Sequence, residues 1–156
     1  MITVSSSSAQ VTRRIGTAIA ARAEPGDAIL LEGSLGSGKT TLVQGVAEGL
    51  GIPIPATSPT FTLIHELRGG RMLLYHVDLY RINSQEHLED LGITDLLDGE
   101  GLLAIEWADR LGSLLPSSYL HITITMAGED RRVVRLEAHG AGGQRLLRAV
   151  EELAPC

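Results

Sequence analysis

Gly33-Ser34-Leu35-Gly36-Ser37-Gly38-Lys39-Thr40 is the stretch that predicts the fold of this 156-residue chain. It matches G-x-x-x-x-G-K-[ST], the phosphate-binding loop of nucleoside-triphosphate proteins. Glycines allow successive backbone N–H groups to turn around an anion. The lysine ammonium reaches the outer phosphates, and the threonine hydroxyl can ligate Mg²⁺. Lys39 is also the only lysine among the 13 lysine and arginine residues, so a chance glycine-rich turn does not explain its position.

The segments that flank this loop predict a strand before it and a helix after it, as the motif requires. Residues 27–32 form a short apolar run bounded by Pro25-Gly26 and the loop, which is typical of a buried parallel strand. After Lys39, apolar residues recur at helical spacing until Gly51 and Pro53, namely Leu42, Val43, Val46, Ala47 and Leu50. A helix N-terminus adds unpaired N–H groups and partial positive charge to a phosphate site. Motif and context together predict nucleotide binding.

The remaining pattern predicts a single α/β phosphate-loop domain over residues 1–156, with a mainly parallel central sheet flanked by helices. A further buried strand is predicted over residues 102–105. Turn signals between alternating segments predict two antiparallel hairpins as additions to the sheet, 61–67 with 71–78 and 119–126 with 131–138.

Apolar periodicity predicts three further helices. Ser7 and Gln10 have the spacing of a capping box, so we expect the serine run at residues 5–8 to start a helix. Residues 85–97 should form a helix whose core candidates are Leu88, Leu91 and Leu96. A closing helix is indicated by Leu146, Leu147, Val150 and Leu153.

The composition is that of a globular domain with an aliphatic core, because 44% of the residues are hydrophobic and only 3% are aromatic. The net charge is −6, and the doublets Arg13-Arg14 and Arg131-Arg132 do not extend into a basic stripe, so tight direct RNA binding is not expected. No apolar run approaches the ~20 residues that span a bilayer, and residues 1–4 lack the start of a secretory signal. The lone Cys156 fits a reducing compartment. We therefore expect a cytoplasmic protein with no membrane partner.

Two carboxylates end predicted strands and are candidates for the acidic group that a phosphate-loop Mg²⁺ site needs. Glu106 follows the apolar run at 102–105, and Asp78 follows the run at 73–77. The alternative for each is a strand-terminal carboxylate that faces solvent.

Three further features have both a functional and a structural interpretation. The hydroxyls of Ser58-Pro59-Thr60-Phe61-Thr62 suit a switch that senses a γ-phosphate or its Mg²⁺, but an ordinary turn would look the same. His76 can pack or hydrogen-bond locally, which favours a structural role. Trp107, the only tryptophan, is either a core anchor or a residue on the nucleotide or partner side.

Taken together, five blocks of sequence resemble the bacterial TsaE-type ATPases of tRNA N6-threonylcarbamoyladenosine biosynthesis. The resemblance covers roughly residues 8 to 126, and the histidine-aspartate and glutamate-tryptophan blocks are more specific than the phosphate loop. The blocks are the loop with a second threonine at 33–41, Ser-Pro-Thr-Phe-Thr-Leu-Ile at 58–64, His-Val-Asp-Leu-Tyr-Arg at 76–81, Leu-Gly-Ile at 91–93 and Ile-Glu-Trp at 105–107.

The resemblance implies a domain that binds ATP and Mg²⁺ and hydrolyses ATP weakly alone. Such proteins act with a two-protein threonylcarbamoyl transfer complex on adenosine 37 of tRNAs that read codons beginning with A, so tRNA is reached indirectly. The resemblance also implies that Thr40 and Glu106 ligate Mg²⁺ and that Lys39, Asp78 and Glu106 are the catalytic residues. The implied cofactor-binding residues are Leu35, Gly36, Ser37, Gly38, Lys39, Thr40, Thr41, Thr62 in the switch-like segment, and Trp107. Ser34 departs from the family, where this position is often acidic.

Two other nucleotide-binding classes share the phosphate loop. A GTPase needs an Asn/Thr-Lys-x-Asp motif, which a chain with Lys39 as its only lysine cannot contain in the usual form. A small-molecule kinase is the alternative function, since it shares the loop and the size. Such kinases usually cover the phosphates with an arginine-bearing lid, whereas Arg131-Arg132 lies in a predicted hairpin.

Overall fold

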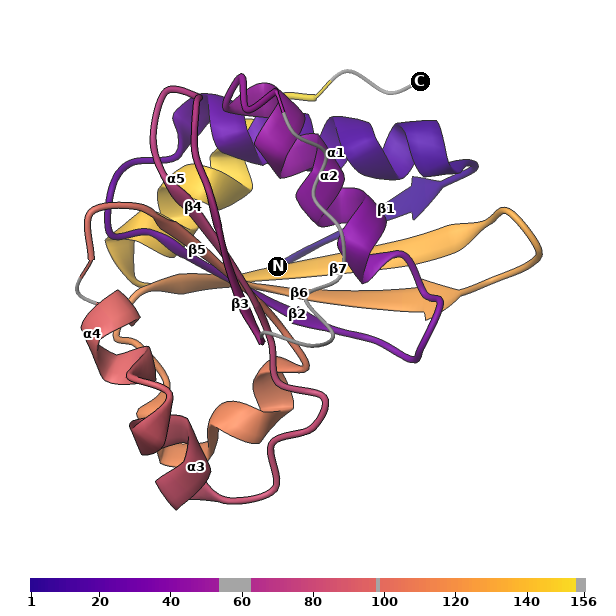
Figure 1. Ribbon diagram of the computed structural model, residues 1–156. Helices are drawn as coiled ribbons and strands as arrows, with labels where there is room; N and C mark the ends of the chain where they lie inside the picture. The colour runs from indigo at the N-terminus through magenta and orange to yellow at the C-terminus, as the bar shows by residue number, and fades with distance from the viewer. Residues whose placement is uncertain (54–62, 98, 154–156) are drawn as a thin grey trace.

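The computed structural model describes residues 1–53, 63–97 and 99–153 of the chain. These residues form a seven-stranded sheet in the order β1-β7-β6-β2-β5-β4-β3 (Figure 1). The four central strands β6, β2, β5 and β4 run parallel, and β3, β7 and β1 add antiparallel pairs at the two edges. The strands are β1 (Ile2–Ser6), β2 (Ala28–Glu32), β3 (Ile64–Leu67), β4 (Leu74–Asp78), β5 (Leu102–Glu106), β6 (Tyr119–Met126) and β7 (Arg132–His139). The predicted α/β fold class is confirmed.

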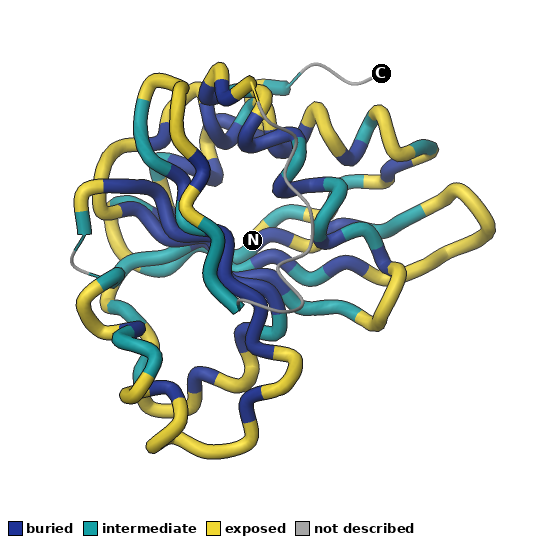
Figure 2. Tube along the Cα trace, in the orientation of Figure 1, coloured by how far each residue is buried: buried dark blue, intermediate teal, exposed yellow. Residues whose placement is uncertain are grey.

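Helices cover both faces of this sheet, which is why its central strands are buried on both sides (Figures 1 and 2). Alternate residues of β2 show the division, because Ile29 and Leu31 join the core beneath α1, α2 and α5, whereas Leu30 joins the core with α3, α4 and η1. The helices are α1 (Ala9–Arg22), α2 (Lys39–Gly49), α3 (Gln85–Asp90), α4 (Ile93–Leu97), the 3₁₀ helix η1 (Ala108–Leu114) and α5 (Gly140–Glu151). None of the described helices is long and apolar enough to cross a membrane.

Helices α1 and α2 approach each other closely through two glycines. A Cβ atom at Gly16 would lie 2.2 Å from the carbonyl oxygen of Leu42, and one at Gly45 would lie 2.1 Å from that of Arg13. Neither distance is sterically possible, so these positions require glycine if the helices are to keep their separation. Because α2 begins at the end of the phosphate loop, this crossing also fixes where the loop lies.

The structure corrects two of the predicted elements. Ser8, not Ser7, caps α1, since its side chain accepts a hydrogen bond from the backbone N–H of Val11 at 3.3 Å. The first half of the serine run belongs to β1, which pairs with β7 at the edge of the sheet. Residues 85–97 form two short helices instead of one, because Gly92 adopts a left-handed conformation (φ 75°) between α3 and α4.

Candidate phosphate-binding site

The predicted site residues meet at the carboxyl edge of the parallel strands, where open α/β sheets bind ligands. The phosphate loop leaves β2 and turns into α2. Glu106 ends β5, the neighbour of β2, and Asp78 ends β4 as the direct register partner of Glu106. Both carboxylates are buried, at 3% and 6% exposure. The alternative that they are solvent-facing strand ends is therefore wrong.

The loop itself requires glycine for two different reasons. Gly38 has φ 112°, a conformation that residues with a Cβ rarely adopt. At Gly33 the limit is space, since a Cβ atom would lie 2.6 Å from the carbonyl oxygen of Ile124 on β6. The loop is thus packed against the sheet at its start and turned sharply at the helix N-terminus. Of its remaining residues, Leu35 and Gly36 are exposed, Ser37 is buried, and Thr40 and Thr41 are half-buried.

Lys39 is almost fully buried, at 4% exposure, and its charge is held inside the loop. Its ammonium nitrogen Nζ donates hydrogen bonds to the carbonyl oxygens of Gly33 at 2.5 Å and Ser34 at 3.2 Å. Burial lowers the pKa of Lys39 below the ordinary value for lysine, and the carboxylates of Glu106, Asp78 and Asp109 oppose that shift. A buried cation whose protein partners are mainly backbone carbonyls is well placed to gain from a bound anion.

Thr40 and Glu106 bring a hydroxyl and a carboxylate together beside Lys39. The Thr40 hydroxyl donates to the Glu106 oxygens Oε1 and Oε2 at 3.3 and 3.0 Å. Both are hard oxygen donors of the kind that Mg²⁺ prefers, and octahedral ligands at about 2.0–2.1 Å from the metal lie about 2.9 Å apart when adjacent. The two side chains could therefore hold Mg²⁺ as neighbouring ligands.

The described residues contain no group of three or more histidine, cysteine, aspartate or glutamate side chains that could hold a metal ion. This fits Mg²⁺, which is usually bound through one or two carboxylates together with waters and substrate phosphates.

Trp107 and Tyr80 form an aromatic wall next to Lys39. The Lys39 Nζ lies 4.2 Å from the centroid of the Trp107 ring, within the range of a cation–π contact. The Trp107 and Tyr80 ring centroids are 4.9 Å apart, and half of Tyr80 is exposed. The backbone of Trp107 is left-handed (φ 59°), which is strained for a large residue and is typical of functional sites. The structure thus places Trp107 on the site side, with part of its ring packed on the core below.

Asp78 also shapes the backbone at this edge. Its Oδ1 accepts a hydrogen bond from the backbone N–H of Tyr80 at 2.9 Å, which closes the turn after β4. This contact uses one carboxylate oxygen to position the chain that carries the aromatic wall.

Arg132 at the start of β7 contacts the phosphate loop, and the sequence reasoning missed it. Its Nε donates to the carbonyl oxygen of Ser37 at 2.8 Å, and its Nη1 donates to the carbonyl oxygens of Gly128 and Glu129 in the β6–β7 turn, each at 3.2 Å. One guanidinium therefore ties the hairpin to the loop. The Arg131-Arg132 doublet was visible, but its placement depends on β6 lying next to β2, which local sequence does not reveal.

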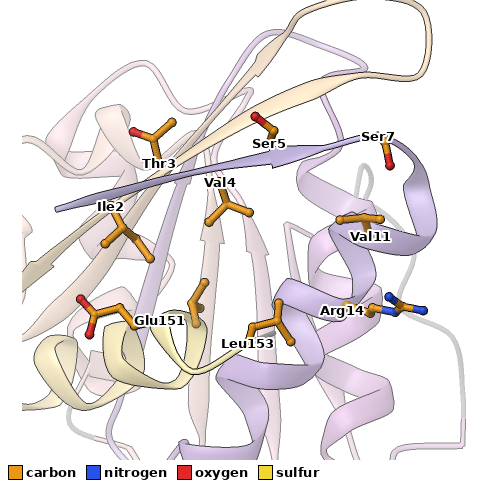
Figure 3. A pocket seen from close by; sticks show the side chains of 10 residues that line it. Ile2, Thr3, Val4, Ser5, Ser7, Val11, Arg14, Glu151 and Leu153 are labelled. Carbon is orange, nitrogen blue, oxygen red and sulfur yellow. The ribbon is translucent and has the colours of Figure 1, made fainter. Parts of the chain in front are cut away.

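A cavity of about 120 Å³ lies beside the loop, between the start of α1 and the β6–β7 hairpin. Its lining residues are Ser8, Ala9, Thr12, Gly36, Gly38, Thr41, Asp130 and Arg132. A separate hollow of about 480 Å³ lies between β1, α1 and α5 (Figure 3). There, Ile2 and Val4 point toward the helices, and no residue of the phosphate loop contributes to the lining. The smaller cavity is the one connected with the predicted site.

Thr62 and the switch-like segment at residues 58–62 lie outside the described residues. The structure therefore brings together Lys39, Thr40, Asp78, Glu106 and Trp107, and leaves the predicted role of Thr62 as a prediction.

Comparison with known proteins agrees with this arrangement. Residues 6–134 match the family described as "Threonylcarbamoyl adenosine biosynthesis protein TsaE". A protein named tRNA threonylcarbamoyladenosine biosynthesis protein TsaE from Bacillus subtilis (strain 168) is 45% identical over 129 residues, which cover 83% of this chain and 80% of the relative. One of the same name from Treponema pallidum (strain Nichols) is 41% identical over 129 residues, covering 83% and 95%. The crystal structure of YdiB from Bacillus subtilis is similar, with a TM-score of 0.78, 35% identity and coverage of 96% of this chain and 93% of that one.

Proposed function

The chain belongs to the TsaE family of tRNA threonylcarbamoyladenosine biosynthesis, and on that premise we propose that it is a Mg²⁺-dependent ATPase. It acts with a two-protein transfer complex that forms N6-threonylcarbamoyladenosine at position 37 of tRNAs reading codons that begin with A. The observation that carries the nucleotide assignment is the convergence of Lys39 with the Thr40–Glu106 pair at the end of the phosphate loop.

The phosphates of ATP occupy the concave side of the loop. There the backbone N–H groups at the start of α2 face the anion. The Lys39 ammonium then exchanges its contacts with the Gly33 and Ser34 carbonyls for charge-assisted contacts with the outer phosphates. Thr40 and Glu106 would hold Mg²⁺, and the bound metal would supply positive charge that offsets the charge developing on the transferred phosphoryl group. The chain's own contribution is to fix these groups before the nucleotide arrives.

Asp78 acts on the attacking water in this proposal. It is buried beside Glu106 and keeps a carboxylate at the edge of the site, while its hydrogen bond to the backbone of Tyr80 holds it in place. A carboxylate so placed orients water for attack on the γ-phosphate. Trp107 shields Lys39 from solvent and strengthens its interaction with the phosphates.

The adenosine part lies in the cavity between α1 and the β6–β7 hairpin. Thr41 and Ser8 contribute hydroxyl groups to its lining, and Arg132 ties this wall to the loop. The usual guanine motif is excluded by the single lysine of the chain. We therefore expect adenine nucleotides to bind in preference to guanine nucleotides.

Calorimetry with ATP, ADP, GTP and GDP in the presence of Mg²⁺ tests this proposal. Tighter binding of ATP and ADP than of their guanine counterparts is expected. Tighter GTP binding, or an absence of any nucleotide binding, would contradict it. Phosphorylation of a metabolite in an acceptor screen would instead favour a small-molecule kinase.

A further inference from the structure

His76 is a completely buried imidazole beneath the candidate site, at 0% exposure. Its Nε2 lies 2.5 Å from Oε2 of Glu106, the carboxylate that also accepts from Thr40. Resting on the function proposed above, we propose that His76 is a positioning residue, which orients the Glu106 carboxylate for the nucleotide-bound Mg²⁺. It acts through Glu106 and does not itself contact the nucleotide.

The sheet register explains how His76 reaches Glu106. In the parallel pairing of β4 with β5, His76 lies opposite Ala104, and Glu106 follows two residues later on the same face. The small side chain of Ala104 leaves room for the imidazole on the face covered by α2. From there the ring contacts the carboxylate from below, while Thr40 contacts it from the helix above. The carboxylate is thus held between a strand and a helix.

The protonation pattern of the ring follows from the same contact. The carboxylate accepts hydrogen bonds, so Nε2 carries the hydrogen and donates it to Glu106. The other ring nitrogen, Nδ1, is buried without a hydrogen-bond partner among the described residues. A buried polar atom without a partner is costly, and an aliphatic side chain at this position would avoid that cost. The contact with Glu106 is the compensating interaction that the structure offers for a histidine here.

A carboxylate ligand that lacks its second hydrogen bond is free to rotate away from the metal. Groups that orient metal ligands in this way typically contribute 10–100-fold to metal affinity. Loss of His76 should therefore weaken nucleotide binding in the presence of Mg²⁺ and leave metal-free binding nearly unchanged, because the loop and Lys39 stay intact.

Calorimetry of ATP binding with Mg²⁺ and with EDTA tests this on four proteins: wild type, His76→Leu, His76→Gln and His65→Leu. We expect His76→Leu to lower affinity by about 10–100-fold with Mg²⁺ and by less than about twofold with EDTA. Gln should recover most of the loss, since its amide nitrogen can replace Nε2 as donor. His65 is the matched control, because it lies opposite His76 on β3, is only half-buried, and has a side chain that makes no hydrogen bond or ion pair with the described residues.

A double-mutant cycle with Glu106→Ala separates positioning from a general effect on packing. In the Glu106→Ala background, His76→Leu should cause no further loss of Mg²⁺-dependent affinity. Equal losses with and without Mg²⁺, additive losses in the cycle, or no recovery by Gln would overturn the proposal. A wild-type protein that fails to bind nucleotide at all would instead refute the proposed function on which this inference depends.

Discussion

At the scale of single residues, the site combines one buried cation with two buried carboxylates, whose charges favour the charged form of Lys39 before any ligand binds. Lys39 is stabilised by Glu106, Asp78 and Asp109, yet burial still lowers its pKa. A bound phosphate would add the strong anionic partner that the protein alone does not supply. The charge of Lys39 should therefore be coupled to nucleotide binding.

This coupling predicts that the affinity for ATP depends on pH in the alkaline range. Phosphate favours the charged form of Lys39, so the pKa of Lys39 is higher in the complex than in the free protein. ATP affinity is then greatest at pH values below the pKa of Lys39 in the free protein. It falls as the pH rises from that value towards the higher pKa of Lys39 in the complex. Because burial lowers the pKa of Lys39 in the free protein, the fall should begin below the ordinary pKa of lysine.

Calorimetric titrations with ATP over a range of alkaline pH check this prediction. Lys39→Arg, which stays charged throughout, should bind more weakly but show a flatter profile. Lys39→Ala should show little binding at any pH. Parallel profiles for the wild type and the arginine variant would mean that another group controls the dependence.

Substitution of Asp78 should affect turnover more than nucleotide binding. In Asp78→Asn the amide oxygen can still accept the hydrogen bond from the Tyr80 backbone, so the turn after β4 should be kept. The charge that orients water is lost, so we expect turnover to fall by about 100-fold while ATP affinity changes by less than about threefold. Steady-state ATP hydrolysis with partner proteins and calorimetry on the same preparation measure the two quantities. Equal losses in both would assign Asp78 a role in binding.

At the scale of elements, the crossing of α1 and α2 determines where the phosphate loop lies. Gly45→Ala would place a methyl group 2.1 Å from the Arg13 carbonyl oxygen and force the helices apart. The cost of overpacking is about 1–3 kcal/mol, which exceeds the gain of up to about 1 kcal/mol from better helix propensity. We expect a lower melting temperature and weaker ATP binding. Glu48→Ala, at an exposed position of the same helix, is the control and should change neither.

A comparison of the predicted and observed elements shows which parts of the fold can be predicted from local sequence. β2, α2 and β5 were predicted nearly to the residue, because each has a clear apolar period and adjacent turn residues. β1 was missed, since a five-residue strand is recognisable only through its pairing with β7 at the far end of the chain. The helix predicted at 85–97 is broken by Gly92, which adopts a left-handed conformation. Apolar periodicity gives no signal for such a conformation.

The same limit applies to the candidate site. Motif spacing predicted Lys39 and Thr40, and the end of the apolar run at 102–105 predicted Glu106, because each of these signals is local in the sequence. The contacts of Arg132 with the loop and of His76 with Glu106 depend on strand order and register, which one sequence does not contain. Residues of this kind can be identified only when the strand order and register of the sheet are known.

At the scale of the whole molecule, the charge distribution bears on how the protein would reach tRNA in the proposed function. The net charge is −6, and Arg132, from one of the two basic doublets, is engaged with backbone carbonyls of the loop and hairpin. Neutralisation of phosphates supplies most non-specific affinity for nucleic acids. We therefore expect the purified chain to bind tRNA weakly and to leave it unmodified without its partners.

Nucleoside analysis of tRNA after multiple turnovers tests the central claim most directly. The reaction contains the two partner proteins, threonylcarbamoyl-adenylate, ATP, Mg²⁺ and tRNA, with or without this chain. Repeated rounds of modification at adenosine 37 should occur only when the chain is present. Lys39→Ala, confirmed as folded, should fail to support them. If omission of the chain changes neither the rate nor the extent of modification, the proposed role in tRNA modification is wrong.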